Sequence, residues 1–389
     1  MFLFDETEQN HEAARIKVIG VGGGGSNAVN NMIACEVTGV EFIAANTDSQ
    51  ALKFSRSPQA LQLGTKLTRG LGAGGRPQIG RESALESIDA IRELLVDTDM
   101  VFVTAGMGGG TGTGAAPIIA NIAKEMGILT VGVVTKPFAF EGPKRMRQAE
   151  EGTQELKKGC HSVIIIPNQK LLTVVEKGTT MVDAFLVVDD VLRQAVQGIS
   201  ALITTPGLMN VDFADVRAVM SHMGRSVIGM GISKGENRAV EAAEKAISSP
   251  LLEESSIEGA RGVLLNVTGG RDLSLHEVNE ASSIIQKVVH PDANIIFGSV
   301  ISEHMTDEVH VTVIATGFEE KEMRKESPKE LIQEVRNELL RPTLVSAPKA
   351  REHENGIMIR KVLRDERQEP APFGDDEWDI PTFLRNQAD

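Results

Sequence analysis

The chain has 389 residues, 41% of them hydrophobic and 24% charged, which is typical of a soluble globular protein with room for two domains. A formal net charge of -14 and the lack of a long basic stripe argue against a nucleic-acid partner and against direct docking on anionic lipid. Two distant cysteines and eight scattered histidines form no metal-ligand motif, so no metal ligands are expected from the protein itself.

The N-terminal stretch is acidic and polar, without the apolar core of a signal peptide. Apolar runs elsewhere fall short of the roughly 20 residues that span a bilayer. We therefore expect a cytoplasmic protein without membrane insertion.

The first half of the chain alternates short apolar runs with helical patterns. Strands are predicted over 16–21, 40–45, 100–104, 129–134 and 162–166, and helices over 81–95 and 115–126. This alternation is typical of an α/β fold with a mostly parallel sheet covered on both faces.

A long amphipathic helix is predicted next, over 180–204, because apolar residues recur there at steps of three and four. A smaller α+β unit follows, with helices over 215–220, 236–247 and 275–289 and strands over 226–232, 262–267, 294–301 and 309–315. The composition beyond residue 318 is polar and rich in charge and proline, which is typical of a disordered tail. We expect an N-terminal tail (1–14), a nucleotide-binding domain (15–179), a core helix (180–205), an α+β domain (206–318), a linker (319–373) and a partner-binding peptide (374–389).

The first strand ends in a glycine cluster that leads into a helix. Backbone N–H groups at such a turn favour a phosphate, and the candidates to hold it are Gly22, Gly23, Gly24, Gly25, Ser26 and Asn27. Asp48 lies near the position at which a dinucleotide-binding domain has its ribose-binding acid. This loop alone therefore leaves a triphosphate, a dinucleotide and a purely structural turn open.

A second, denser glycine loop follows the strand over 100–104. Its candidate phosphate ligands are Gly108, Gly109, Gly110, Thr111, Gly112 and Thr113. A dinucleotide domain has no use for a second cradle, whereas a triphosphate does; the competing interpretation is a flexible lid. The P-loop pattern GxxxxGK[ST] is absent from the sequence.

The run from Gly108 to Gly114 resembles the signature of the tubulin/FtsZ GTPase family. The segments 46–48, 137–141 and 210–215 and the ending 379–384 are similar to the bacterial cell-division branch of that family. The resemblance implies a Rossmann-like GTPase domain, a long core helix, a smaller α+β domain and a disordered C-terminal tail. It also implies polymerisation-dependent GTP hydrolysis in head-to-tail filaments at the mid-cell division ring.

Further site residues follow from the resemblance. Glu141 and Arg145 are expected at the ribose and phosphates, and Asn168, Phe185 and Asp190 at the guanine. The residue before Asp190 is Asp189, at a position where the family usually has Asn, so two carboxylates are adjacent here. Magnesium, bound mainly through the GTP or GDP, is the implied ion, and potassium stays open as another.

Neither glycine loop contains an acid that could orient water. The family resemblance assigns that role to Asp212 and Asp215, assisted by Asn210 and acting on the nucleotide of the next subunit; from the residues alone, an N-cap is an equal alternative. The peptide 379–384 is implied to bind membrane adaptors of the FtsA-like and ZipA-like kinds. A filament that keeps its nucleotide only as a structural filler and a nucleotide-dependent oxidoreductase are the competing functions.

Overall fold

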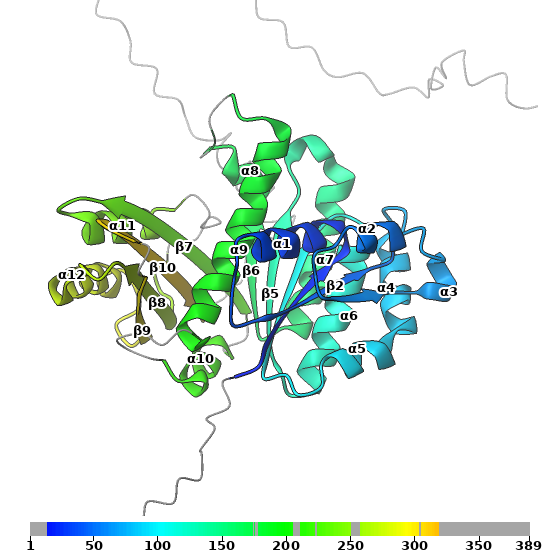
Figure 1. The fold of residues 1–389 in the computed structure, drawn as a ribbon, viewed down its shortest axis with the longest axis horizontal. Coiled ribbons are helices and arrows are strands. Elements are labelled where there is room, and N and C mark those ends of the chain that lie inside the picture. Colours follow the sequence, from blue (N-terminus) through cyan, green and yellow to red (C-terminus); the bar gives the residue numbers. More distant parts are fainter. Residues whose placement is uncertain are drawn as a thin grey trace, which may run out of the picture. The chain divides into compact units, whose positions relative to one another are not determined.

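The structure is a computed structural model that describes residues 14–173, 175, 178–204, 211–221, 224–249, 257–302 and 305–318 (Figure 1). The expected tails, the linker and the adaptor-binding peptide lie outside these ranges, as does Asn210. Among the helices of the described ranges, none has both the length and the apolar character of a membrane span.

Ten strands form one sheet in which the second half of the chain continues the first. In spatial order they are β3 (Gln59–Gln62), β2 (Glu41–Asn46), β1 (Ile16–Val21), β4 (Met100–Gly106), β5 (Leu129–Lys136), β6 (Ser162–Pro167), β7 (Gly224–Lys234), β10 (Glu308–Thr316), β8 (Gly262–Gly269) and β9 (Asn294–Ile301). The strands from β3 to β7 are parallel, β10 is antiparallel to both β7 and β8, and β8 and β9 are parallel. The predicted mostly parallel α/β fold is confirmed.

Helices cover both faces of the parallel strands, and strand residues alternate between the two cores. In β4, Phe102 packs in the core with α1 (Gly22–Ala34) and α9 (Met181–Thr204). Val101 and Val103 pack on the opposite face with α4 (Pro77–Glu86), α5 (Ile88–Leu94), α6 (Thr111–Glu125) and α7 (Pro143–Gly159). Burial on both faces explains why these strands read as continuous apolar runs.

The smaller C-terminal layer has a core of its own. There α11 (Arg238–Ile247) and α12 (Leu275–Gln286) pack on strands β7, β8 and β10. Residues of α9 share the first core with Ile228, Leu264 and Ile314 from the C-terminal strands. The long helix thus packs against both halves of the sheet, as Figure 1 shows; α10 (Phe213–Met220) follows it.

Two helix predictions need correction. The helix expected over 81–95 is divided at Ser87, whose backbone leaves the helical region and whose Oγ accepts a hydrogen bond from the Gly64 N–H at 3.1 Å. Helix α7 was missed because its sequence is mostly polar and its buried residues are mainly small. The short elements α2 (Ser49–Lys53), β3, α3 (Thr65–Thr68), η1 (Ala139–Glu141) and α8 (Asn168–Leu171) were also not predicted.

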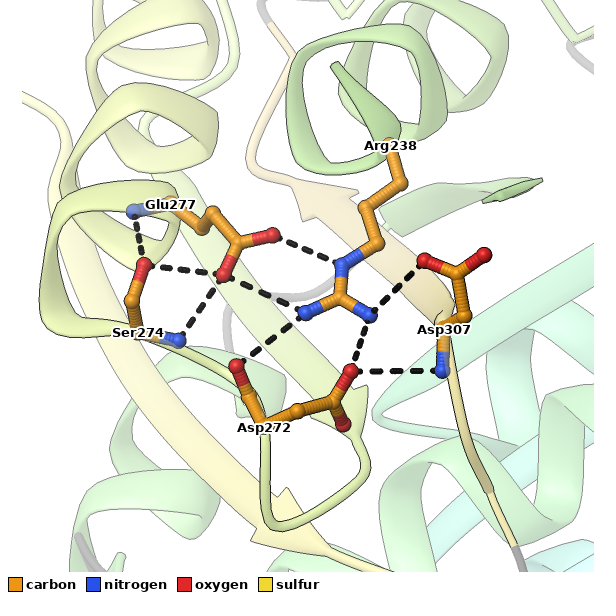
Figure 2. A network of polar contacts seen from close by, with 5 residues as sticks. All are labelled: Arg238, Asp272, Ser274, Glu277 and Asp307. Atoms are coloured by element: carbon orange, nitrogen blue, oxygen red, sulfur yellow. Dashed lines mark hydrogen bonds and ion pairs between the residues drawn. The ribbon is translucent and has the colours of Figure 1, made fainter. Parts of the chain in front are cut away.

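One buried arginine ties the connections of the C-terminal layer together. The Arg238 side chain is only 6% exposed, and its Nε donates to Glu277 Oε1 at 2.7 Å. It also pairs with Asp272 and lies 3.7 Å from Asp307, so one guanidinium joins α11, the β8–α12 connection and the approach to β10 (Figure 2). Hydrogen bonds from Arg238 hold the pKa values of Glu277 and Asp272 below their usual values.

We expect Arg238→Met to lower the thermal unfolding midpoint at pH 7 by at least about 5 °C, because it leaves the partly buried Glu277 carboxylate without its partner. Since the folded-state pKa values are lowered, this stabilisation is present above the unfolded pKa of about 4 and is lost as pH falls through the folded values. The control is Lys234→Met, which removes an exposed ion pair with Glu308. Equal midpoints for the two variants, or a gap that persists at pH 2, would contradict the prediction.

Candidate functional site

The two glycine loops leave the same edge of the sheet from neighbouring strands. Strands β1 and β4 are parallel and in register, with Val21 opposite Ala105. The chain runs from β1 outward to β2 on one side and later returns to β4 on the other, so the strand order reverses between them. In open parallel sheets such a switch point, at the carboxyl ends of the strands, is where ligands bind.

Each loop begins a helix that has no cap. Helix α1 starts at Gly22 and α6 at Thr111, and neither start has a side-chain cap or an acidic residue in its first turn. The first N–H groups of a helix lack intrahelical partners, and the helix dipole adds positive potential there. Two such ends beside one cavity favour a ligand with several negative charges.

In each loop, one glycine combines a positive φ with a close approach of other backbone atoms. Gly22 has φ +71°, and a Cβ there would stand 2.8 Å from the Gly112 nitrogen of the other loop. Gly108 has φ +97°, and its Cβ would lie 2.7 Å from the Arg145 carbonyl oxygen. The Gly108 N–H donates to Thr113 Oγ1 at 2.8 Å, which folds the second loop onto its own helix. These residues therefore set the backbone conformation of the two loops.

A cavity of about 430 Å³ opens over both loops. Eleven of the predicted site residues line it: Gly23, Gly24, Asn27, Gly109, Gly110, Thr111, Gly112, Glu141, Arg145, Asn168 and Phe185. The cavity wall does not include Gly22, Gly25, Ser26, Gly108, Thr113 or Asp190. The first five of these belong to the loops that carry the lining residues.

The end of the cavity away from the loops is shaped for a flat group with polar edges. Asn168, the first residue of α8, is buried, and its Oδ1 has no hydrogen-bond partner among the described residues. Phe185 of α9 is partly exposed and meets Phe138 edge-on at a centroid distance of 5.6 Å. An open aromatic face and a free buried acceptor suit a nucleobase.

Of the two adjacent acids on α9, Asp189 is the one that lines the cavity. Asp190 points elsewhere: it accepts from Arg193 Nε at 2.7 Å and from Gln194. Neighbouring helix residues project about 100° apart, so only one of them can face the ligand. Burial raises the pKa of Asp189 to about 7. The cavity geometry therefore favours Asp189 over the predicted Asp190 as the acid that faces a ligand in this cavity.

Glu141 and Arg145 are paired with each other in the wall of the cavity. They form an i,i+4 ion pair at 2.8 Å, and both line the cavity. Glu141 also accepts the Phe138 N–H at 2.9 Å. The carboxylate thus holds Arg145 and the turn before α7 in place, and it is not free to act as a base.

Asp48, which left dinucleotide binding as an alternative in the sequence, has a structural role. Asp48 caps α2, and its Oδ1 accepts from the N–H groups of Gln50 at 2.8 Å and Ala51 at 3.3 Å. It does not line the cavity. Asp48 therefore does not serve as the ribose-binding acid that a dinucleotide would need.

A third glycine-rich loop beside the cavity was missed from the sequence. It runs over 70–76, and Gly70, Gly72, Gly74 and Gly75 all have positive φ. A Cβ on Gly110 would stand 2.9 Å from the Ala73 Cβ and 3.0 Å from the Arg76 nitrogen, so this loop lies directly against the second phosphate loop. Its density of glycine was the available signal. Leu71 in this loop is 84% exposed.

The predicted catalytic acids lie at the opposite edge of the sheet. Asp212 occupies the N-cap position of α10 without a capping hydrogen bond from its side chain, and Asp215 is in the first turn; both are exposed. The Arg217 side chain on the same helix donates to the Gly127 carbonyl, just before β5 begins, whereas the cavity is lined by Thr135 and Pro137 at the end of β5. Eight strand residues, roughly 26 Å, separate these edges.

A Rossmann-ordered sheet with two anion-binding loops at its switch point defines a nucleotide-phosphate-binding protein. Comparison with known families gives two matches, the Tubulin/FtsZ family, GTPase domain, over residues 15–176, and the FtsZ family, C-terminal domain, over residues 224–319. The chain belongs to the tubulin/FtsZ family of GTPases, and its nucleotides are GTP and GDP.

Solved structures agree with this assignment. An empty FtsZ dimer from M. jannaschii is 45% identical, with a TM-score of 0.76 over 79% of this chain and 89% of that one. A tryptophan-to-tyrosine mutant of the M. jannaschii FtsZ matches equally well and is covered to 92%. CetZ2 from Haloferax volcanii, at 18% identity and a TM-score of 0.67 over 84% of this chain and 99% of that one, shares the fold.

We expect Gly108→Ala to weaken GTP and GDP binding at least about tenfold, because the added Cβ displaces the Arg145 backbone from the cavity wall. Gly235→Ala is the matched control: Gly235 has φ +94°, and nothing lies within 4 Å of a Cβ there. Both variants should lose about 1–2 kcal/mol of stability to the left-handed backbone, but only the first should lose affinity in equilibrium titrations. Equal affinities would show that the loop can absorb the methyl group.

Proposed function

We propose that the chain hydrolyses GTP in a site shared between two copies, and that copies add head to tail into a filament. The single observation that carries this proposal is the position of the acids of α10 at the edge of the sheet opposite the nucleotide cavity.

GTP would lie with its phosphates over the two uncapped helix starts and its base at the far end of the cavity. Arg145 and Glu141 lie where the ribose and phosphates would be. Asn168, Phe185 and Asp189 would hold the guanine, with Phe185 against its face. A carboxylate accepts from both N1–H and the 2-amino group of guanine, which adenine cannot offer, so Asp189 would select the base.

The described wall of the cavity supplies phosphate grip but no free acid to orient water. Its lining carboxylates there are Glu141, paired with Arg145, and Asp189, at the base end. Magnesium carried by the nucleotide would neutralise charge on the β- and γ-phosphates. At the phosphate end the cavity offers backbone and hydroxyl donors, which fits an ion held mainly through phosphate oxygens. One of these hydroxyls, Thr111 Oγ1, is hydrogen-bonded to Thr47 Oγ1 at 2.6 Å.

A second copy can supply the missing acids. If the edge of its sheet that carries α10 meets the cavity edge of the first copy, Asp212 and Asp215 approach the γ-phosphate. They can then polarise the attacking water, with Asn210 assisting. Exposed Leu71, in the loop beside the cavity, offers apolar surface for that contact. Head-to-tail contact between unlike surfaces grows an open polymer when the rotation between subunits does not close a ring. The 45% identical FtsZ of M. jannaschii has itself been solved as a dimer.

The cellular role follows from the family. We propose that the filaments form the cytoplasmic ring at the mid-cell division site of a bacterium, and that the peptide 379–384 binds FtsA-like or ZipA-like membrane adaptors. The bacterial branch rests on the sequence motifs, because the solved structures named above come from M. jannaschii and Haloferax volcanii. A nucleotide-dependent oxidoreductase is disfavoured because Asp48 is used as a helix cap.

Replacement of Asp189 by Asn should remove a pH dependence of GDP affinity. Guanine binds the carboxylate, and the free-state pKa is about 7, so binding below that pH must first release a proton. We expect wild-type affinity, relative to Asp189→Asn, to be constant above pH 7 and to fall about tenfold per unit below it. The comparison cancels titration of the phosphates.

Asp190→Asn is the control and should keep the wild-type profile. The measurement is an equilibrium titration of dilute protein with GDP between pH 5.5 and 8.5. A profile altered by Asp190→Asn and not by Asp189→Asn would return the base-reading role to Asp190.

Turnover should require contact between copies. We expect turnover per molecule to collapse on dilution below the assembly threshold, and Asp212→Ala to keep GTP affinity but lose most activity. A mixture of Asp212→Ala with Asp189→Ala should recover about a quarter of wild-type turnover, since random neighbours combine an intact pocket with intact acids at roughly one interface in four. Phosphate release measures turnover, and sedimentation measures assembly. Turnover that is unchanged on dilution would contradict the proposal.

A further inference from the structure

The carboxyl end of α6 contacts neighbouring elements at the edge of the sheet opposite the nucleotide cavity. Helix α6 starts at the second phosphate loop and ends before Gly127, which has φ +80°. Lys124 in its last turn donates to the Lys158 carbonyl at 3.0 Å, at the end of α7. With 15 residues, α6 is a rod of roughly 22 Å that joins the nucleotide cavity to the opposite edge.

Arg217 connects α10 to this rod. Its guanidinium donates to the Gly127 carbonyl oxygen at 2.9 Å, across 90 residues of sequence. It also lies near His161, whose pKa is lowered by burial and then by the positive charges of Lys124 and Arg217. The contact therefore sits among the amino ends of the strands β5 and β6.

Besides the Arg217 contact, α10 is held near its carboxyl end by a hydrogen bond from Thr316 Oγ1 to the Val219 carbonyl oxygen at 3.3 Å, and otherwise by its apolar face. Val216, Val219 and Met220 are fully buried and form its apolar face. Apolar burial is strong but non-directional, whereas a hydrogen bond from a charged donor to a carbonyl restricts both distance and angle. Arg217 follows Asp215 by two residues on the same short helix, so whatever fixes Arg217 also fixes the acids.

We propose that Arg217 is a positioning residue for GTP hydrolysis, which acts by fixing α10, and with it Asp212 and Asp215, to the carboxyl end of α6. This rests on the proposed function, since the acids are placed for the neighbour's nucleotide. It adds that the phosphate loop of a subunit and the acids that the subunit presents to the next are joined through one rigid helix.

The first test does not depend on assembly. Arg217→Met removes the donor, Arg217→Lys keeps one, and Arg92→Met is the control because Arg92 makes an exposed pair with Glu125 at the same end of α6, at 3.8 Å. In dilute protein with GDP, amide hydrogen exchange over 213–220 should be about tenfold faster in Arg217→Met. It should be near wild type in the other two.

The second test measures turnover per polymerised subunit. We expect Arg217→Met to reduce it about tenfold with unchanged GDP affinity and unfolding midpoint, Arg217→Lys to recover most of it, and Arg92→Met to match wild type. Normalising phosphate release to sedimented protein separates positioning from assembly.

A raised assembly threshold with normal turnover per polymerised subunit would make Arg217 a simple interface contact and overturn the proposal. So would unchanged exchange over 213–220. The wild-type dilution series is run in parallel: turnover that does not depend on dilution overturns the shared site itself, whereas normal dilution dependence with a silent Arg217→Met overturns only the role of Arg217.

Discussion

The parallel pairing of β1 with β4 is the constraint on which the site depends. Because Val21 and Ala105 are opposite each other, the chain leaves both strands at the same level, and the two glycine loops meet. Each loop then begins a helix whose free N–H groups face one cavity. A slip of this register by two residues would separate the loops by roughly 7 Å, and the two uncapped helix starts would no longer face the same ligand.

The same parallel arrangement gives the molecule two chemically different edges. Every parallel strand ends at the cavity edge and begins at the other, so loops before and after a strand such as β5 can never meet within one chain. Gly127 precedes β5 and contacts α10 through Arg217, while Pro137 follows it and lines the cavity. Sheet polarity thus separates the glycine loops from the acids of α10, and under the proposed function a second molecule brings them together.

Much of this could be predicted from the sequence, for reasons visible in particular residues. Strands such as β4 are buried on both faces and read as plain apolar runs, and the glycines of both loops stand in dense clusters. Helix α7 was missed because small residues such as Gly152 and Thr153 occupy most of its buried positions, where larger apolar side chains would have marked a stripe. The choice between Asp189 and Asp190 depends on the rotation of α9 against the sheet, which tertiary packing decides. Arg238 was missed because its partners lie 34 and 39 residues away.

The separation of grip from acids has a consequence for control. A cavity that held GTP and its own water-orienting acid would hydrolyse the nucleotide in every free molecule. Of the carboxylates in the described cavity wall, Glu141 is paired with Arg145 and accepts the Phe138 N–H, and the half-buried Asp189 lies where the proposal places the base. If the acids come from a neighbour, as proposed, the free subunit can bind GTP without consuming it. Under the proposed function, hydrolysis begins only once a neighbour has docked. GDP in a cavity therefore indicates that an interface has formed there.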